Sequence, residues 1–289
     1  MFHGSLVAII TPMQTDDSID YAAFEKLIDW HMQNKTTGLV VLGTTGESAT
    51  IESDERRELI RCAVARVHHT IPVIVGTGTN STAQSILLTR EAMALGADAV
   101  LLVTPYYNKP TQAGLFQHYR AIAQAVPIPQ ILYNVPGRTA CDLLPETISR
   151  LSQFANIIGV KEATGDLNRL KKLLSLNLKM DFYSGDDATA MEFMLQGGQG
   201  VISVAANIVP KTFYELCVAA LKKDRIAAEK INNQLVDLYS ALFIESNPIP
   251  TKWVLQKMGL IQSGIRLPLT TLSVAHHAIV QSVMQQILI

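Results

Sequence analysis

A lysine follows directly on an apolar run in the segment Asn156–Glu162, with no turn signal before it. The run Ile157–Val160 is typical of a buried strand, so Lys161 is expected at the end of that strand rather than on the surface, where most lysines lie. A lysine amine is nucleophilic when it is neutral, and burial favours the neutral form. Lys161 is therefore the candidate nucleophile, able to attack a carbonyl group and form a Schiff base.

Three further groups follow apolar runs in the same way. Tyr133 is a candidate proton donor or acceptor, and a packed aromatic ring is the alternative. Arg138 carries a planar guanidinium suited to a carboxylate, with a salt bridge inside a loop or a contact with a helix as the alternatives. The loop Gly43–Ser48 could point several backbone N–H groups at one anion, or it could form only a tight turn. One lysine, several hydroxyl groups and one arginine make a chemically coherent set.

The elements that position these groups alternate in type along the chain. The helical stretches between the apolar runs are Tyr21–His31, Asp54–Val67, Ser81–Leu95, Gly114–Ala125, Leu167–Leu176, Ala188–Leu195 and Pro210–Leu221. The predicted strands are Leu6–Ile10, Gly38–Leu42, Pro72–Val75, Ala99–Val103, Gln130–Tyr133, Ile157–Val160, Asp181–Ser184 and Gly200–Val204.

This order predicts the α/β class, with a (β/α)8 TIM barrel over residues 1–223. No GxGxxG sequence follows the first strand, which argues against an open dinucleotide-binding sheet. The pattern of residues 224–289 predicts a three-helix region that covers the barrel or a partner subunit. The three predicted helices are Ile226–Phe243, Pro248–Met258 and Leu272–Ile287. In such barrels the active site lies at the carboxyl ends of the strands, where the chemical groups above are expected to meet.

Composition excludes several classes of protein. Of the 289 residues 48% are hydrophobic and 17% charged, as in a folded domain without disorder. The net charge of −1 and the scattered basic residues argue against nucleic-acid binding. No long uncharged apolar run or secretion signal occurs, so no membrane partner is expected. Histidines lack metal-ligand spacing, so no catalytic metal is expected. A cytoplasmic location fits the widely separated Cys62, Cys141 and Cys217.

Seven sequence motifs follow or lie near the predicted strand ends: GTTGES at 43–48, TPYYNKP at 104–110, YNVPGRT at 133–139, GVKEATGD at 159–166, SGDD at 184–187, GVISV at 200–204 and NPIPTKW at 247–253. Together these motifs resemble those of the dihydrodipicolinate synthase family, within the pyruvate-dependent class I aldolases and lyases. The resemblance implies condensation of pyruvate with aspartate 4-semialdehyde to a cyclic 4-hydroxy-tetrahydrodipicolinate, in lysine and diaminopimelate biosynthesis, with no external cofactor.

The resemblance also implies a role for particular residues. Lys161 matches the Schiff-base lysine and Tyr133 the proton shuttle, while Thr44 matches a hydroxyl that relays between tyrosines. Tyr107 matches the residue that reaches into the neighbouring subunit's site, so catalysis requires at least a dimer. The usual assembly of the family is a homotetramer built as a dimer of dimers.

The substrate-binding positions follow from the same motifs. Backbone groups of Thr44 and Thr45 match the site of the pyruvate carboxylate, and Arg138 matches the group that holds the carboxylate of the second substrate. Carbonyl groups near Gly185 and Ile202 complete this pocket in the family.

A regulatory site is implied less fully. Many relatives are inhibited by lysine at a site to which Ser48, Ala49, Asn80 and Tyr106 correspond. Where lysine-sensitive relatives often carry two histidines and a glutamate, this chain has Ser53, Arg56 and Gln84. The last change removes a carboxylate that would pair with the ligand's charged nitrogen, so weak or absent lysine inhibition is expected. Gln84 also fits a helix capping box that starts at Ser81.

Two rival functions are left open. An N-acetylneuraminate or 2-keto-3-deoxy sugar acid aldolase would use the same lysine and tyrosine and differ in the second substrate. A catalytically idle paralogue would bind a small keto acid as a sensor or an assembly partner. Loss of Lys161, Tyr133 or Arg138 would have favoured the idle protein, and all three are present.

Overall fold

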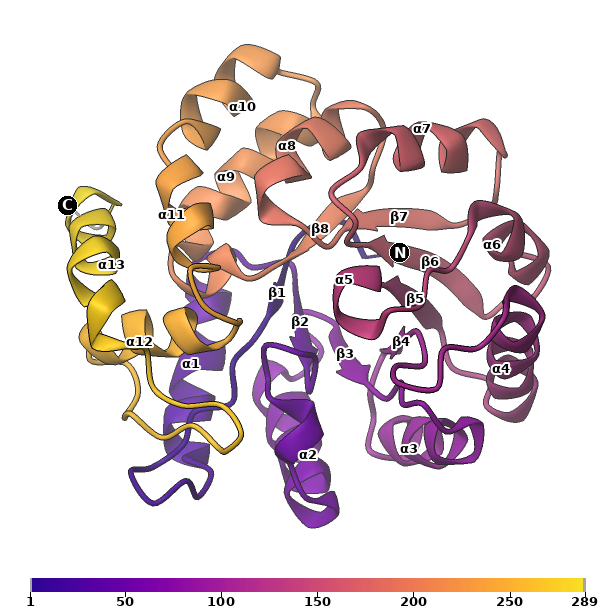
Figure 1. The fold of residues 1–289 in the computed structure, drawn as a ribbon, viewed down its shortest axis with the longest axis horizontal. Coiled ribbons are helices and arrows are strands. Elements are labelled where there is room, and N and C mark those ends of the chain that lie inside the picture. Colours follow the sequence, from indigo (N-terminus) through magenta and orange to yellow (C-terminus); the bar gives the residue numbers. More distant parts are fainter. Residues whose placement is uncertain (1, 288–289) are drawn as a thin grey trace.

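The computed structural model describes residues 2–287, and its centre is a closed barrel of eight parallel strands in chain order. The predicted (β/α)8 barrel is confirmed, because β8 pairs with β1 and closes the sheet (Figure 1). The strands are β1 Gly4–Ala8, β2 Gly38–Val41, β3 Val73–Gly76, β4 Ala99–Val103, β5 Gln130–Asn134, β6 Ile157–Glu162, β7 Asp181–Ser184 and β8 Gly200–Ser203.

The strands read as continuous apolar runs because both of their faces are buried. Alternate side chains fill the inside of the barrel, where Leu6, Val40, Leu101 and Ile131 pack against one another. The other set faces the surrounding helices and forms the larger apolar layer. Polar groups enter the barrel interior at Tyr133 and Lys161, near the carboxyl ends of β5 and β6, and at Tyr183 on β7, whose hydroxyl donates to Asp181.

Nine α-helices up to Leu221 connect or follow the strands within the described residues. Two were not predicted: α5, a single turn, and α6, which is only seven residues long and begins with Pro145 in its first turn. The bounds are α1 Tyr21–Gln33, α2 Ser53–Val67, α3 Thr82–Ala94, α4 Gln112–Ala125, α5 Pro136–Thr139, α6 Pro145–Leu151, α7 Leu167–Ser175, α8 Asp187–Leu195 and α9 Pro210–Leu221; short 3₁₀ turns span Ser48–Thr50 and Ala205–Asn207.

The C-terminal region contains α10 Arg225–Asn232, α11 Val236–Ala241, α12 Ile249–Lys257 and α13 Val274–Ile287. The single helix predicted over 226–243 is wrong, because a turn separates α10 from α11. There the Leu235 N–H bonds to the carbonyl of Asn232, and the Asn232 side chain accepts from the Tyr239 hydroxyl. Asn232 and Asn233 are also weak helix formers. The boundary at residue 223 stays a prediction, since α10 packs on α9 of the barrel.

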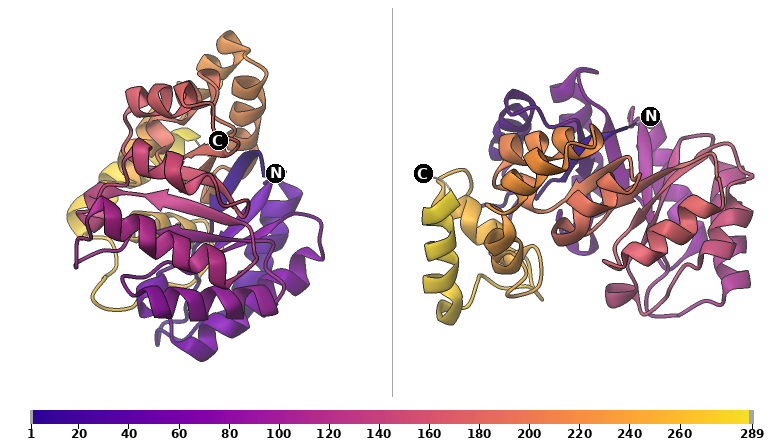
Figure 2. Two further views of the ribbon diagram at one scale, coloured as in Figure 1. Left: turned by 90° about the vertical axis from the view of Figure 1, so that its right-hand side faces the viewer. Right: turned by 90° about the horizontal axis from the view of Figure 1, so that it is seen from above.

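The last two helices stand at one side of the barrel, across from α4 and α6, in both Figure 1 and Figure 2. Through the chain between α11 and α12 this region also reaches the end of the barrel where the strands terminate. Over residues 2–287 no helix is both long and apolar enough to span a bilayer.

Candidate active site

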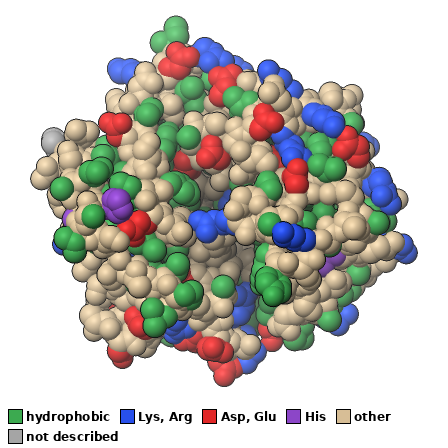
Figure 3. All heavy atoms as spheres, in the orientation of Figure 1, with side chains coloured by type: hydrophobic (Ala, Val, Ile, Leu, Met, Phe, Trp, Pro, Cys, Tyr) green, Lys and Arg blue, Asp and Glu red, His purple; other side chains and the backbone are tan. Residues whose placement is uncertain are grey.

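A cavity of about 120 Å³ lies where the strands end, and its wall includes six of the eight residues predicted for catalysis or substrate binding. The space-filling view of this face is hollowed near its centre, with lysine or arginine side chains beside the hollow (Figure 3). The six residues are Thr44, Thr45, Tyr133, Arg138, Lys161 and Gly185.

Lys161 lies on β6 directly beside Tyr133 on β5, in register across the two strands. Its Nζ is 4.2 Å from the centre of the Tyr133 ring, and the residue is 6% exposed. Among the described residues the Lys161 amine has no acidic partner and no hydrogen-bond acceptor, and the Tyr133 hydroxyl is likewise unbonded. A buried amine away from carboxylates is suited to attack a carbonyl, and an unbonded phenol beside it is available to move protons.

The loop after β2 presents free backbone donors to the same cavity. Inside it, Gly46 N–H bonds to the Gly43 carbonyl and Glu47 N–H to the Thr44 carbonyl, which closes a tight turn. Within residues 2–287 the N–H groups of Thr44 and Thr45 donate to no protein acceptor. The loop is therefore a tight turn, as one of the two alternatives states, and its free N–H groups are available to a small anion.

Arg138 reaches the cavity from α5 and is exposed. Its Nη2 donates to the backbone carbonyl of Asn247 at 3.4 Å, a long bond, and the part of the chain that is described contains no carboxylate paired with it. The salt bridge considered as an alternative is therefore absent from residues 2–287. The guanidinium fork remains open to a carboxylate on a ligand.

Gly185 follows β7 and leaves the space that Lys161 occupies. A Cβ atom at this position would lie 2.9 Å from Lys161 Cε and 2.6 Å from the Ala163 Cβ. Carbon atoms in contact lie about 3.5–4.0 Å apart, so no larger residue fits without moving the lysine. Gly185 is therefore required by the close approach of both Ala163 and the Lys161 side chain.

Two predicted site residues lie outside this cavity. Tyr107 is 90% exposed and has a positive φ of 72°, which is unusual for a bulky residue. Ile202 is buried on β8 inside the barrel, and Val204 reaches the cavity wall in its place. No hydrogen bond joins the side chains of Thr44, Tyr133 and Tyr107 among the described residues.

The residues predicted for a lysine site surround the start of α2 and α3. Arg56 is buried and donates to the carbonyl groups of Ser48, at 3.3 Å, and Gly76, at 2.6 Å. Asn80 accepts from Asn108, whereas Ala49, Gln84 and Tyr106 are exposed. Ser81 caps α3 through the Gln84 N–H, but no reciprocal bond from the Gln84 side chain occurs within residues 2–287, so only half of the predicted capping box forms.

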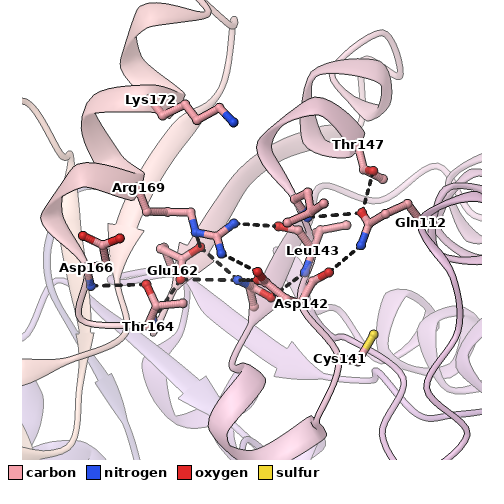
Figure 4. A network of polar contacts seen from close by, with 12 residues as sticks. Gln112, Cys141, Asp142, Leu143, Thr147, Glu162, Thr164, Asp166, Arg169 and Lys172 are labelled. Atoms are coloured by element: carbon pink, nitrogen blue, oxygen red, sulfur yellow. Dashed lines mark hydrogen bonds and ion pairs between the residues drawn. The ribbon is translucent and has the colours of Figure 1, made fainter.

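A buried polar network fixes the ends of β5 and β6 from outside the barrel (Figure 4). Glu162 accepts from the Asn134 side chain at 3.1 Å and from the Thr164 N–H at 2.9 Å, and Arg169 Nε lies 3.8 Å from it. Arg169 also bonds to Asp142 at 2.5 Å. Burial raises the pKa of Glu162, and the bonds from Asn134 and Thr164 oppose that rise. Because neighbouring strand residues face opposite sides, this network holds the backbone while Lys161 points into the cavity.

The residues of the cavity wall that were not predicted include Asp186, Val204, Phe243 and Asn247. Asp186 caps α8 by accepting from Thr189, as its position before a helix indicates. Asn247 lies in the motif at 247–253, but no local pattern indicates that it reaches the barrel. The contact of Asn247 with the cavity depends on the folded arrangement of segments that are far apart in the sequence.

The comparisons with known proteins agree with this geometry. A model of the dihydrodipicolinate synthetase family matches residues 1–287. The chain belongs to this family. It is 58% identical to the 4-hydroxy-tetrahydrodipicolinate synthase of Coxiella burnetii over 287 residues, 99% of each chain.

Solved structures of family members have the same fold as this chain. The chloride-inhibited dihydrodipicolinate synthase of Acinetobacter baumannii, complexed with pyruvate, matches with a TM-score of 0.98 and 51% identity over 99% of each chain. The lysine-bound DHDPS of Cyanidioschyzon merolae matches with a TM-score of 0.95 and 36% identity, over 99% of this chain and 98% of the other.

Proposed function

We propose that the chain condenses pyruvate with L-aspartate 4-semialdehyde, through a Schiff base on Lys161, to give 4-hydroxy-tetrahydrodipicolinate. One observation carries the proposal: the buried Lys161 amine, which has no acidic partner within residues 2–287, faces a cavity where the N–H groups of Thr44 and Thr45 donate to no acceptor in that range. The family supports it, since the Coxiella burnetii relative is named as this synthase and the Acinetobacter baumannii relative has pyruvate bound.

In the proposed reaction Lys161 Nζ attacks the ketone carbon of pyruvate, and water leaves as the iminium forms. The iminium withdraws electrons, so the methyl group loses a proton and becomes an enamine. The enamine carbon attacks the aldehyde carbon of the second substrate. The amino group of that substrate then displaces Lys161, which closes the ring and frees the enzyme. Tyr133 would carry the protons, with Thr44 as the relay.

Each substrate carboxylate has a proposed partner in the cavity. The N–H groups of Thr44 and Thr45 would hold the carboxylate of pyruvate. The guanidinium of Arg138 would hold the carboxylate of the aldehyde and orient it toward the enamine. Carbonyl groups near Gly185 and Ile202 would complete this second pocket.

We also propose that the chain works as a homo-oligomer, a tetramer formed by two dimers, in which Tyr107 enters the partner's site. The 90% exposure of this tyrosine supports the proposal. Mixing a Lys161→Ala variant with a Tyr107→Phe variant tests it, because a mixed dimer then has one site with both groups intact. Recovery of activity on mixing is expected. No recovery after verified subunit exchange would place the function of Tyr107 elsewhere.

Lysine is not proposed as an inhibitor of this chain. The buried Arg56 guanidinium contacts Ser48, one of the predicted site residues, and Gln84 supplies no carboxylate for a ligand ammonium group. A lysine titration of the condensation reaction is expected to be flat, and strong inhibition by low lysine concentrations would contradict this view.

The deciding experiment is a condensation assay with pyruvate and aspartate semialdehyde, with borohydride trapping of pyruvate in parallel. Turnover and a trapped adduct on Lys161 are expected. Cleavage of N-acetylneuraminate or a keto-deoxy sugar acid to pyruvate and a sugar aldehyde, without the condensation activity, would favour the rival aldolase. An adduct without any turnover would indicate an idle keto-acid binder. All three cysteines are unpaired, which supports the cytoplasm as the proposed location.

A further inference from the structure

The chain between α11 and α12 makes two contacts with the cavity from a distant part of the sequence. Asn247 Nδ2 donates to the Thr45 hydroxyl at 2.9 Å, across 202 positions of the chain. Its backbone carbonyl accepts from Arg138. The side chain is itself held by the Thr251 hydroxyl, which donates to Asn247 Oδ1 at 3.3 Å. One buried residue thus contacts both of the proposed carboxylate-binding elements.

A second contact from the C-terminal region holds the loop after β2 at Glu47, two residues beyond Thr45. Lys252 Nζ on α12 lies 2.5 Å from Glu47 Oε1, and the two side chains are only 5% and 1% exposed. The other carboxylate oxygen of Glu47 accepts from the Arg266 backbone N–H at 3.2 Å. Glu47 also has a positive φ of 56°, a conformation that side-chain-bearing residues rarely adopt.

Because the Glu47–Lys252 ion pair is buried, it restricts the position of the loop that contains Glu47. Burial lowers the pKa of Lys252, and the Glu47 carboxylate opposes part of that change. The attraction within such a pair roughly balances the loss of hydration, so the pair adds little net stability. Each ion nevertheless needs its partner in place, because an unpaired buried charge is strongly unfavourable. The pair therefore restricts where the loop after β2 can lie relative to α12.

We infer that Asn247 and the Glu47–Lys252 pair are positioning residues, which hold the loop so that the Thr44 and Thr45 N–H groups face a carboxylate of pyruvate attached to Lys161. This inference rests on the proposed function. The three residues act through the loop and touch no reacting atom.

The test uses two variants of the full chain. In Glu47→Gln/Lys252→Met both charges are removed together, so that no unpaired ion remains buried. In Asn247→Ala the bond to Thr45 is removed without any change in charge. Pyruvate is titrated against borohydride trapping on Lys161, and KM and kcat are measured separately. Leu27→Ala, a cavity-forming change in α1, serves as the control for lowered stability, because Leu27 is buried in the outer apolar layer.

Both variants are expected to need about tenfold more pyruvate for half-maximal trapping, with kcat at saturation reduced far less, since a lost binding contact raises KM. Leu27→Ala should lower the melting temperature and leave half-saturation unchanged. Unchanged half-saturation in either folded variant would overturn the inference. If the wild-type chain itself traps no pyruvate, the proposed function fails first. Should the double variant not fold, Asn247→Ala alone decides the matter.

Discussion

Lys161 and Tyr133 lie on neighbouring strands, whereas Thr44 and Thr45 lie on a loop, and the two sides of the cavity are fixed by different means. The strand side is set by the β5–β6 ladder and by the adjacent Glu162–Arg169 network. The loop side depends on side chains that come from the C-terminal region. Positions on strands are thus determined by the barrel itself, while positions on the loop require a second region to be docked.

The largest effect is expected from the nucleophile on the strand side. Lys161→Ala should abolish the borohydride-trapped adduct and reduce turnover by on the order of a thousandfold or more, because within residues 2–287 no other lysine lines the cavity. Its melting temperature should stay close to that of the wild type. Lys172→Ala, a change at an exposed lysine paired with Glu146, is the control and should trap normally. A trapped adduct in Lys161→Ala would move the nucleophile elsewhere.

The network behind the strands should affect stability more than substrate binding. Arg169→Met leaves Glu162 and Asp142 without their cation, which is expected to cost about 3 kcal/mol of unfolding free energy. Denaturant titration measures this, and KM for pyruvate should change little. The exposed Lys172→Met change should cost about 1 kcal/mol or less. If Arg169→Met raised the KM for pyruvate and left the unfolding free energy unchanged, the network behind the strands would act on substrate binding and not on stability.

Gly185→Ala tests how closely the strand side is packed. The added Cβ would push against Lys161 Cε, and a displacement of about 1 Å at a reacting group lowers rates by about a hundredfold. Gly137→Ala is the matched control, since a Cβ there meets no atom within 4 Å. If Gly185→Ala kept wild-type kinetics, the Lys161 side chain would be able to adopt another conformation that still places its amine for the reaction.

The last prediction concerns Asp187, which lies behind the cavity wall and bonds to the backbone of the wall residue Val204. Asp187 is buried and accepts from the N–H groups of Val204 and Ala205, and burial raises its pKa to about 6. Its protonated form is therefore favoured by folding, so this stabilisation is present below about pH 4 and is lost as the pH rises through about 6. The change is about 3 kcal/mol at most.

Melting temperatures of the wild type and Asp187→Asn, measured across this range, check the expectation. The wild type should lose stability relative to the variant as the pH rises, because the asparagine stays neutral throughout. A constant difference between the two proteins would show that the pKa of Asp187 is the same in the folded and unfolded states.

The strand side was predictable from sequence, because apolar runs locate strands and the residues that end them share one face of a barrel. This gave Lys161 and Tyr133 in their observed places. Helix α6 escaped prediction because seven residues carry little periodicity. The break between α10 and α11 depends on a hydrogen bond to Tyr239 that no local pattern indicates. Asn247 and Lys252 lie about two hundred residues from their partners, and only the folded chain brings them together.

The docking of α12 onto the loop after β2 also sets an order of events during synthesis. When the ribosome has synthesised the last barrel strand, Lys161 and Tyr133 are already part of the nascent chain. Asn247 and Lys252, the partners of Thr45 and Glu47, have not yet been synthesised. If the proposed function holds, the nascent chain contains the reactive Lys161 amine before the loop that binds the pyruvate carboxylate is held in position. Cellular keto acids would therefore meet the fully positioned carboxylate site only after residue 266 has left the exit tunnel.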